Sequence, residues 1–135
     1  MENLIFDRTQ TDIEQKTSKG YYNYTDLNRI ETWCEYLANL LNSYSYPVSI
    51  TIKKNWNMSD LPNVNDMERI RSNVNAIKTA FHAYTDVPEN LNYMTIEKAN
   101  DIEKILSEID FLTKNMISSF RYSNTFNSGE SEGLN

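Results

Sequence analysis

A threefold internal repeat is the feature of this sequence that most constrains its fold. Three related segments follow one another at offsets of 37 and 35 residues: LNRIETW at 27–33, VNDMERI at 64–70 and ANDIEKI at 99–105. After each segment, apolar residues continue in the same register at steps of three and four, which places them on one face of a helix. The matched sets are Ile30, Met67 and Ile102; Trp33, Ile70 and Ile105; Leu37, Val74 and Ile109; Leu40, Ile77 and Leu112; and Tyr44, Phe81 and Met116. The repeat therefore predicts three amphipathic helices with matched core layers.

The expected fold is mainly α-helical, a three-helix bundle with a short β element. We place the long helices at about 26–44, 66–84 and 96–121. The connection 85–94 could return along a helix of about 28 Å only if it were nearly fully extended. We therefore expect the second and third helices to be antiparallel, and we leave the orientation of the first helix open.

The β element is expected near 48–53. Pro47 ends the first helix, because proline cannot continue an α-helix. Val48, Ile50 and Ile52 then alternate with polar residues. This period of two is typical of a short strand with one buried face.

Polar residues at several positions indicate where the helices start. Thr9 with Asp12 predicts a short N-terminal helix, and Thr25 or Asp26 is expected to start the first long helix. Asn65 with Glu68 has the spacing of a capping box for the second. Thr95 can cap the third.

Composition indicates one domain spanning residues 1–135 that does not bind nucleic acid or membranes. The net charge of −6 disfavours contact with a phosphate backbone, which requires clustered lysine and arginine. No apolar run approaches the roughly 20 residues of a membrane span, and the first residues do not resemble a signal peptide. Cys34 is the only cysteine, so no disulfide can form within one chain.

For each residue that could be catalytic or bind a metal, we favour a structural role. The pairs Asn28/Glu31, Asn65/Glu68 and Asn100/Glu103 recur with the repeat. Carboxylate metal sites in bundles also require Glu-x-x-His pairs, and these are absent. His82 is the only histidine, and the sequence shows no nucleophile elbow or other local context for a catalytic serine. Cys34 lies on the apolar face of a helix, where a thiol behaves as a small hydrophobe. We expect no catalytic, cofactor-binding or metal-binding residue.

Aromatic residues gather near the predicted helix ends and in the tail. They form either plugs at the ends of the bundle or an interaction surface for a protein or a sugar. The terminal segments 1–8 and 122–135 also contain apolar residues and could act as interaction arms. The candidate surface residues are Tyr21, Tyr22, Tyr24, Tyr46, Trp56, Tyr122 and Phe126.

The chain resembles a family of small tail-associated and minor structural proteins of phages and prophages of low-GC Gram-positive bacteria. The resemblance covers most of residues 4–130 and transfers no residue roles. It is carried by LIFDRTQTDIEQ at 4–15, YNYTDLNRIE at 22–31, NDMERIRSNVNAIK at 65–78, ANDIEKILSEID at 99–110 and NMISSFRYSNTFNSGE at 115–130.

This resemblance implies a non-enzymatic module of the virion that acts through protein contacts. Its expected partners are other phage structural proteins or further copies of the chain. The expected location is the virion or the cytoplasm of the bacterial host. Two alternatives remain: a small acidic inhibitor of a host nucleic-acid-binding protein, and a carbohydrate-binding adhesin module.

Overall fold

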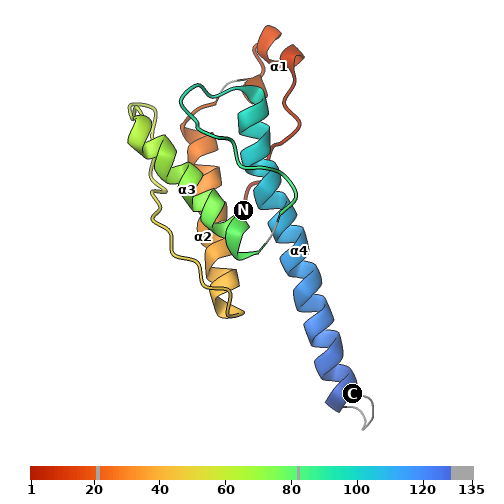
Figure 1. Ribbon diagram of the computed structural model, residues 1–135. Coiled ribbons are helices and arrows are strands. Elements are labelled where there is room, and N and C mark those ends of the chain that lie inside the picture. Colours follow the sequence, from red (N-terminus) through yellow and green to blue (C-terminus); the bar gives the residue numbers. More distant parts are fainter. Residues whose placement is uncertain (21, 82, 129–135) are drawn as a thin grey trace.

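Three long helices that run in the same direction form the body of the protein (Figure 1). The computed structural model describes residues 1–20, 22–81 and 83–128. The long helices are α2 (Tyr24–Ser43), α3 (Val64–Ala80) and α4 (Ile96–Ser128). A short helix α1 (Gln10–Glu14) and the 3-10 turn η1 (Ser18–Gly20) precede them. The expectation of a mainly helical bundle is confirmed.

Asparagine and threonine side chains start the helices, although not always where the sequence suggested. Asn23 caps α2, with Asp26 completing the capping box, so the prediction that Thr25 or Asp26 starts this helix is wrong. Asn63 caps α3 together with Asp66, so the predicted capping box of Asn65 and Glu68 is wrong. The competing Asn-x-x-Asp pair lies two residues earlier and starts the helix first, because a side-chain oxygen there already accepts a free amide of the first turn.

The other two predicted helix starts agree with the structure. Thr9 and Asp12 form the capping box of α1. At the start of α4, Thr95 Oγ1 accepts the backbone N–H of Lys98 at 3.1 Å.

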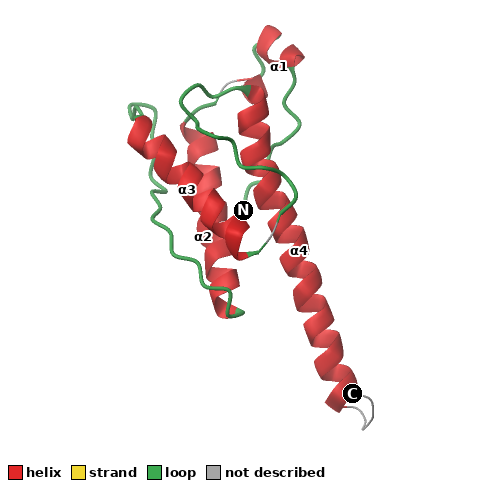
Figure 2. Ribbon diagram, in the orientation of Figure 1, coloured by secondary structure: helices red, strands yellow, loops and turns green. Residues whose placement is uncertain are grey.

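The segment 48–56, which we call the middle strap, has no β structure. Its backbone groups bond to side chains of the helices: Thr51 O accepts from Arg69 and Asn73, and Lys53 N–H donates to Glu31. The predicted β element near 48–53 is therefore wrong (Figure 2). The alternation of apolar residues was real, but helix side chains satisfy the backbone where a strand would need a neighbouring strand.

The prediction that the second and third helices are antiparallel is also wrong. The beginnings of α3 and α4 lie at the same end of the molecule, where Met67 of α3 and Met94, just before α4, line one hollow (Figure 1). Their later parts meet as well, where Ala80, Phe81 and Leu112 line another. The cause is the end of α3 at Ala80, which leaves a connection of residues 81–95. That length spans roughly 50 Å, about twice the length of α3.

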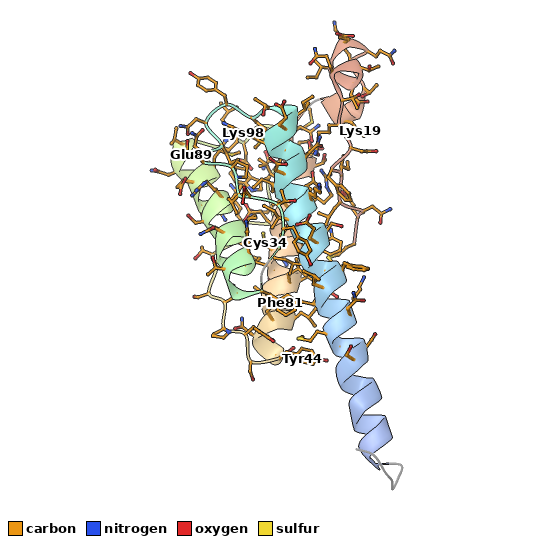
Figure 3. The ribbon with its side chains drawn as sticks, turned by 45° about the vertical axis from the view of Figure 1, so that its right-hand side comes forward. Lys19, Cys34, Tyr44, Phe81, Glu89 and Lys98 are labelled. Carbon is orange, nitrogen blue, oxygen red and sulfur yellow. The ribbon has the colours of Figure 1, made fainter. Side chains whose placement is uncertain are left out.

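The core lies between the three long helices. The middle predicted layer, Leu37, Val74 and Ile109, is completely buried. Trp56 and Leu91 add buried side chains from the two long connections. The remaining core residues are Leu27, Ile30, Cys34, Leu41, Ile70, Ile77, Ile102, Ile105 and Leu106. Figure 3 shows Cys34 inside the bundle.

The terminal segments differ from the expected free arms. Residues 2–8, which we call the N-terminal strap, lie along α2 and α4. The backbone of α4 is helical to Ser128, so the arm predicted at 122–135 is helix for its first seven residues. This part of α4 extends past the ends of α2 and α3 (Figure 1). Residues 129–135 lie outside the described residues.

Candidate functional site

Asn28 and Glu31 of α2 hold the middle strap and form what we call the α2 clamp. The amide of Asn28 makes two hydrogen bonds of 2.9 Å with the backbone of Trp56, donating to its carbonyl and accepting from its N–H. Glu31 accepts the backbone N–H of Lys53 at 2.9 Å and the indole N–H of Trp56 at 2.7 Å. Arg69 of α3 donates to both oxygens of Glu31, at 2.6 and 2.7 Å.

Asn100 and Glu103 of α4 hold the N-terminal strap in the same way and form the α4 clamp. Asn100 makes two hydrogen bonds of 3.0 Å with the backbone N–H and C=O of Arg8. Glu103 accepts the backbone N–H of Ile5 at 2.9 Å and the guanidinium of Arg8 at 2.6 Å. Arg29 of α2 donates to both oxygens of Glu103, at 2.7 Å each.

The third pair, Asn65 and Glu68 of α3, makes no such contacts. Both residues are exposed. Glu68 bonds to Arg71 and Ser72 of its own helix, and Asn65 has no side-chain hydrogen bond in the described part of the chain. The three helices therefore do not form three equivalent units.

The connection before α4 lacks the donors that the middle strap offers to the α2 clamp. Trp56 lies nine residues before Asn65, and Leu91 lies nine residues before Asn100. Leu91 has no side-chain donor, and Pro88, three residues earlier, has no N–H to offer a carboxylate. Arg71 Nε instead donates to the carbonyl of Pro88 at 2.6 Å. The connection before α4 is thus held by Arg71 of α3 rather than by Asn65 and Glu68.

The charges buried at the α4 clamp balance one another. Arg8 and Arg29 face Glu103 and Asp26, and each of these side chains is less than a tenth exposed. Burial alone would lower the pKa of Arg29, but hydrogen bonds and the charges of Glu103 and Asp26 outweigh it and raise that pKa. Burial and the same two carboxylates raise the pKa of the Tyr22 phenol, which therefore stays neutral. With both oxygens of Glu103 occupied by donors, this cluster secures the strap.

The other reactive candidates are buried or undescribed. Cys34 is 1% exposed, and burial, reinforced by the nearby charge of Glu31, raises the pKa of its thiol. The thiolate needed for nucleophilic chemistry is therefore disfavoured. His82 lies outside the described residues. Among the residues that the structure describes, no group of three or more His, Cys, Asp or Glu side chains is placed to hold a metal ion.

The predicted aromatic residues are scattered over the molecule. Trp56 is 5% exposed and belongs to the core. Tyr22 and Tyr24 line a hollow at the end where the long helices begin. Tyr46 packs edge-to-face on Phe81 at the other end, with ring centroids 5.1 Å apart. Tyr21 and the side chains of Tyr122 and Phe126 lie outside what the structure describes.

The hollow beside Tyr22 and Tyr24, which we call the end groove, is the candidate functional site. Its volume is about 550 Å³. On its rim Leu61 is 89% exposed and Met58 is 83% exposed, because both lie in the turn between the middle strap and α3. Methionines suit an adaptable binding surface. The apolar lining consists of Leu27, Met58, Leu61, Pro62, Met67, Leu91 and Met94 together with the two tyrosines.

Sequence reasoning found the two tyrosines of this groove but missed Met58 and Leu61. The available signal was an apolar pair inside a polar loop, at NMSDLP. Isolated exposed apolar residues are common on proteins, so this signal was weak. Only the tertiary structure shows that both residues border one hollow.

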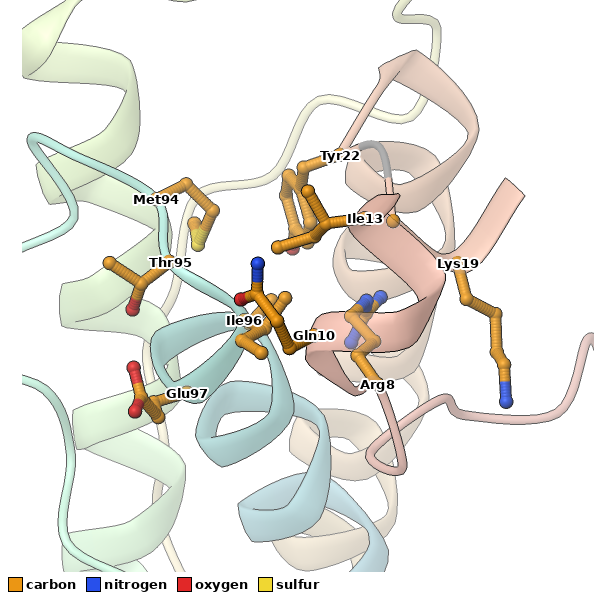
Figure 4. A pocket seen from close by; sticks show the side chains of 11 residues that line it. Arg8, Gln10, Ile13, Lys19, Tyr22, Met94, Thr95, Ile96 and Glu97 are labelled. Atoms are coloured by element: carbon orange, nitrogen blue, oxygen red, sulfur yellow. The ribbon is translucent and has the colours of Figure 1, made fainter. Parts of the chain in front are cut away.

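A second, more polar hollow of about 430 Å³ adjoins the end groove, and Tyr22 and Met94 line both. Figure 4 shows Tyr22 and Ile13 on one side and Met94 and Thr95 on the other, with Lys19 pointing away. This hollow separates α1 and η1 from the start of α4.

Comparisons with known proteins assign this chain to no family. No helix in the described part of the chain is both long and apolar enough to cross a membrane. Neither a protein-family profile, nor a curated protein, nor a solved structure matches the chain significantly.

Proposed function

We propose that this domain is a non-catalytic interaction module that docks a protein partner in the end groove. The observation that carries the proposal is the exposure of Leu61 and Met58 beside a hollow lined by methionine and tyrosine. Exposing apolar side chains to water is unfavourable, and a contiguous exposed apolar patch commonly marks a binding surface.

The state of the polar residues supports a non-catalytic role. Glu31 and Glu103 are saturated by arginine and backbone donors. Cys34 is buried with a raised pKa. A catalytic group needs a free lone pair or a labile proton within reach of a substrate, and these side chains offer neither.

The resemblance to phage tail-associated proteins gives the proposed context. In that context the module is a virion component or accessory, and its partner is another phage structural protein or a second copy of the chain. The acidic charge agrees with a protein partner rather than nucleic acid. We also propose that each long helix and the connection before it derive from one ancestral unit, of which α3 has lost its clamp.

Site-specific photo-cross-linking tests the docking surface. A benzophenone amino acid replaces Leu61 in one variant and Phe111 in a matched control, in cells that assemble the virion. Phe111 is also an exposed apolar residue, 64% exposed on α4, but it does not line the groove. We expect at least fivefold more adduct with one virion protein from position 61, identified by mass spectrometry. Equal yields from both positions, or adducts from Phe111 alone, would contradict the proposed groove.

A further inference from the structure

We propose that the α4 clamp also accepts the N-terminal strap of a second copy of the chain, so that two copies exchange their straps. This inference does not rest on the end groove. It assigns residues 2–8 as an interaction segment and the surface between α2 and α4 as its receptor.

The contacts of the strap are the first step. The clamp recognises a short extended segment through groups that this segment carries by itself: the backbone N–H of Ile5, and the backbone and guanidinium of Arg8. Trp33 adds a hydrogen bond of 2.9 Å to the carbonyl of Glu2. None of these contacts depends on the residues that follow Arg8, so the same segment from another copy would satisfy them equally.

The second step is the independence of the residues that join the strap to α2. Helix α1 contains no buried residue. It is secured within its own segment, because Thr17 donates to Asp12 and a Cβ at Gly20 would lie 2.5 Å from the carbonyl of Asp12. The polar hollow separates this small unit from α4 (Figure 4). The described hydrogen bonds of residues 9–20 stay within this segment, so it can rearrange without breaking a hydrogen bond to the bundle.

A backbone outlier lies within this joining segment. Lys16 has φ 56°, the left-handed conformation that non-glycine residues rarely adopt. Opening the segment between α1 and η1 would release that strain. Since exchange keeps every clamp contact, chain concentration and the strain of the joining segment decide between the closed and the exchanged forms.

Charge reversal in the full-length chain tests the exchange. The native cluster holds two guanidinium groups, Arg8 and Arg29, and two carboxylates, Asp26 and Glu103. In a chain whose strap lies in its own clamp, Arg8→Glu leaves three carboxylates and one guanidinium in the cluster. Glu103→Arg leaves three guanidinium groups and one carboxylate. In an exchanged pair of the two variants, one cluster is native and the other is balanced again.

We expect the co-refolded mixture to sediment at twice the 15.8 kDa mass of one chain, as a one-to-one heterodimer by native mass spectrometry. The midpoint of thermal unfolding should exceed that of either variant alone. Should the single variants not fold, recovery of helical circular dichroism on mixing supports the exchange. A mixture that stays as two separate species, or fails to recover helix while the refolded wild type remains monomeric, overturns it.

The matched control reverses an exposed ion pair that also joins the strap to its own chain. Asp7 and Lys19 lie 3.2 Å apart, with side chains 74% and 37% exposed. A mixture of Asp7→Lys and Lys19→Asp keeps the α4 clamp and should associate no more than the wild type does, because an exposed pair contributes little. A gain in dimer over the wild type as large as that of the Arg8→Glu and Glu103→Arg mixture would overturn the assignment of the exchange to the α4 clamp.

Discussion

Glu31 and Glu103 are almost fully buried, and each is balanced by arginine. Glu31 faces Arg69, while Glu103 shares Arg8 and Arg29 with Asp26. Buried ion pairs add little net stability when complete, but removing one partner leaves an uncompensated charge and costs about 3–5 kcal/mol. At the residue scale, these carboxylates specify which segment lies against which helix.

Cys34 gives a prediction about pH. Its thiol titrates near 9.0 when free, and burial raises the pKa in the folded protein. Above pH 9 the unfolded chain therefore loses this proton more readily than the folded chain, so the free energy of unfolding falls as pH rises. Urea unfolding of the wild type between pH 8 and 10.5 should show this decline. The Cys34→Ala variant should decline less steeply, by up to about 1.4 kcal/mol per pH unit.

The alanine variant also has a fixed stability loss, because it leaves a small cavity. Only the difference in slope therefore bears on the thiol. Parallel pH curves for the two proteins would show that Cys34 ionises equally in both states. Burial would then not raise the pKa of the Cys34 thiol in the folded protein.

At the scale of elements, two extended straps hold the three parallel helices together. The middle strap lies along α2 and α3, and the N-terminal strap lies along α2 and α4. Each replaces the hydrogen bonds of a β-ladder with bonds from asparagine, glutamate and arginine side chains. Parallel helices need long return connections, and here those connections become part of the packing.

Asn28 and Asn65 occupy matched positions in the aligned segments LNRIETW and VNDMERI and allow a direct test of the α2 clamp. Asn28→Ala leaves the backbone N–H and C=O of Trp56 without partners, which should cost about 1–3 kcal/mol. Asn65→Ala removes an exposed side chain and should change stability by no more than about 0.5 kcal/mol. Urea unfolding of both variants measures the difference. Similar changes in both variants would mean that the two hydrogen bonds of Asn28 to the middle strap add no stability.

At the scale of the whole molecule, α4 is 33 residues long and extends beyond the ends of α2 and α3. Among the side chains of α4 that the structure describes, Thr113 is the last buried one, and those of residues 114–119 are half-buried or exposed. The helix therefore continues past the core through its own backbone hydrogen bonds. We expect its projecting part to contribute little to the stability of the bundle.

Deleting residues 122–135 tests this division. We expect a smaller helical signal by circular dichroism, because the backbone of α4 is helical to Ser128. The midpoint of thermal unfolding should stay within about 2 °C of the full-length value, since a domain of this size shifts by several degrees per kcal/mol. A fall of 5 °C or more would show that the segment packs against the bundle.

The sequence by itself determined the three long helices and most of their buried faces. The spacing of apolar residues is enough to predict them, because residues three and four positions apart lie on one face of a helix. Leu37, Val74 and Ile109 were identified as buried in this way. The tyrosines of the end groove followed from aromatic clustering near helix ends.

Tertiary structure alone decided the direction of the helices, the two clamps and the rim of the end groove. Glu31 meets Lys53, and Glu103 meets Ile5, 98 positions away in the sequence. No local pattern encodes such pairings, because they depend on where a whole connection lies once the core has formed. Glu31 and Glu103 are buried on α2 and α4, whereas Glu68 is exposed on α3, where the connection before α4 contains Pro88, which has no N–H to donate.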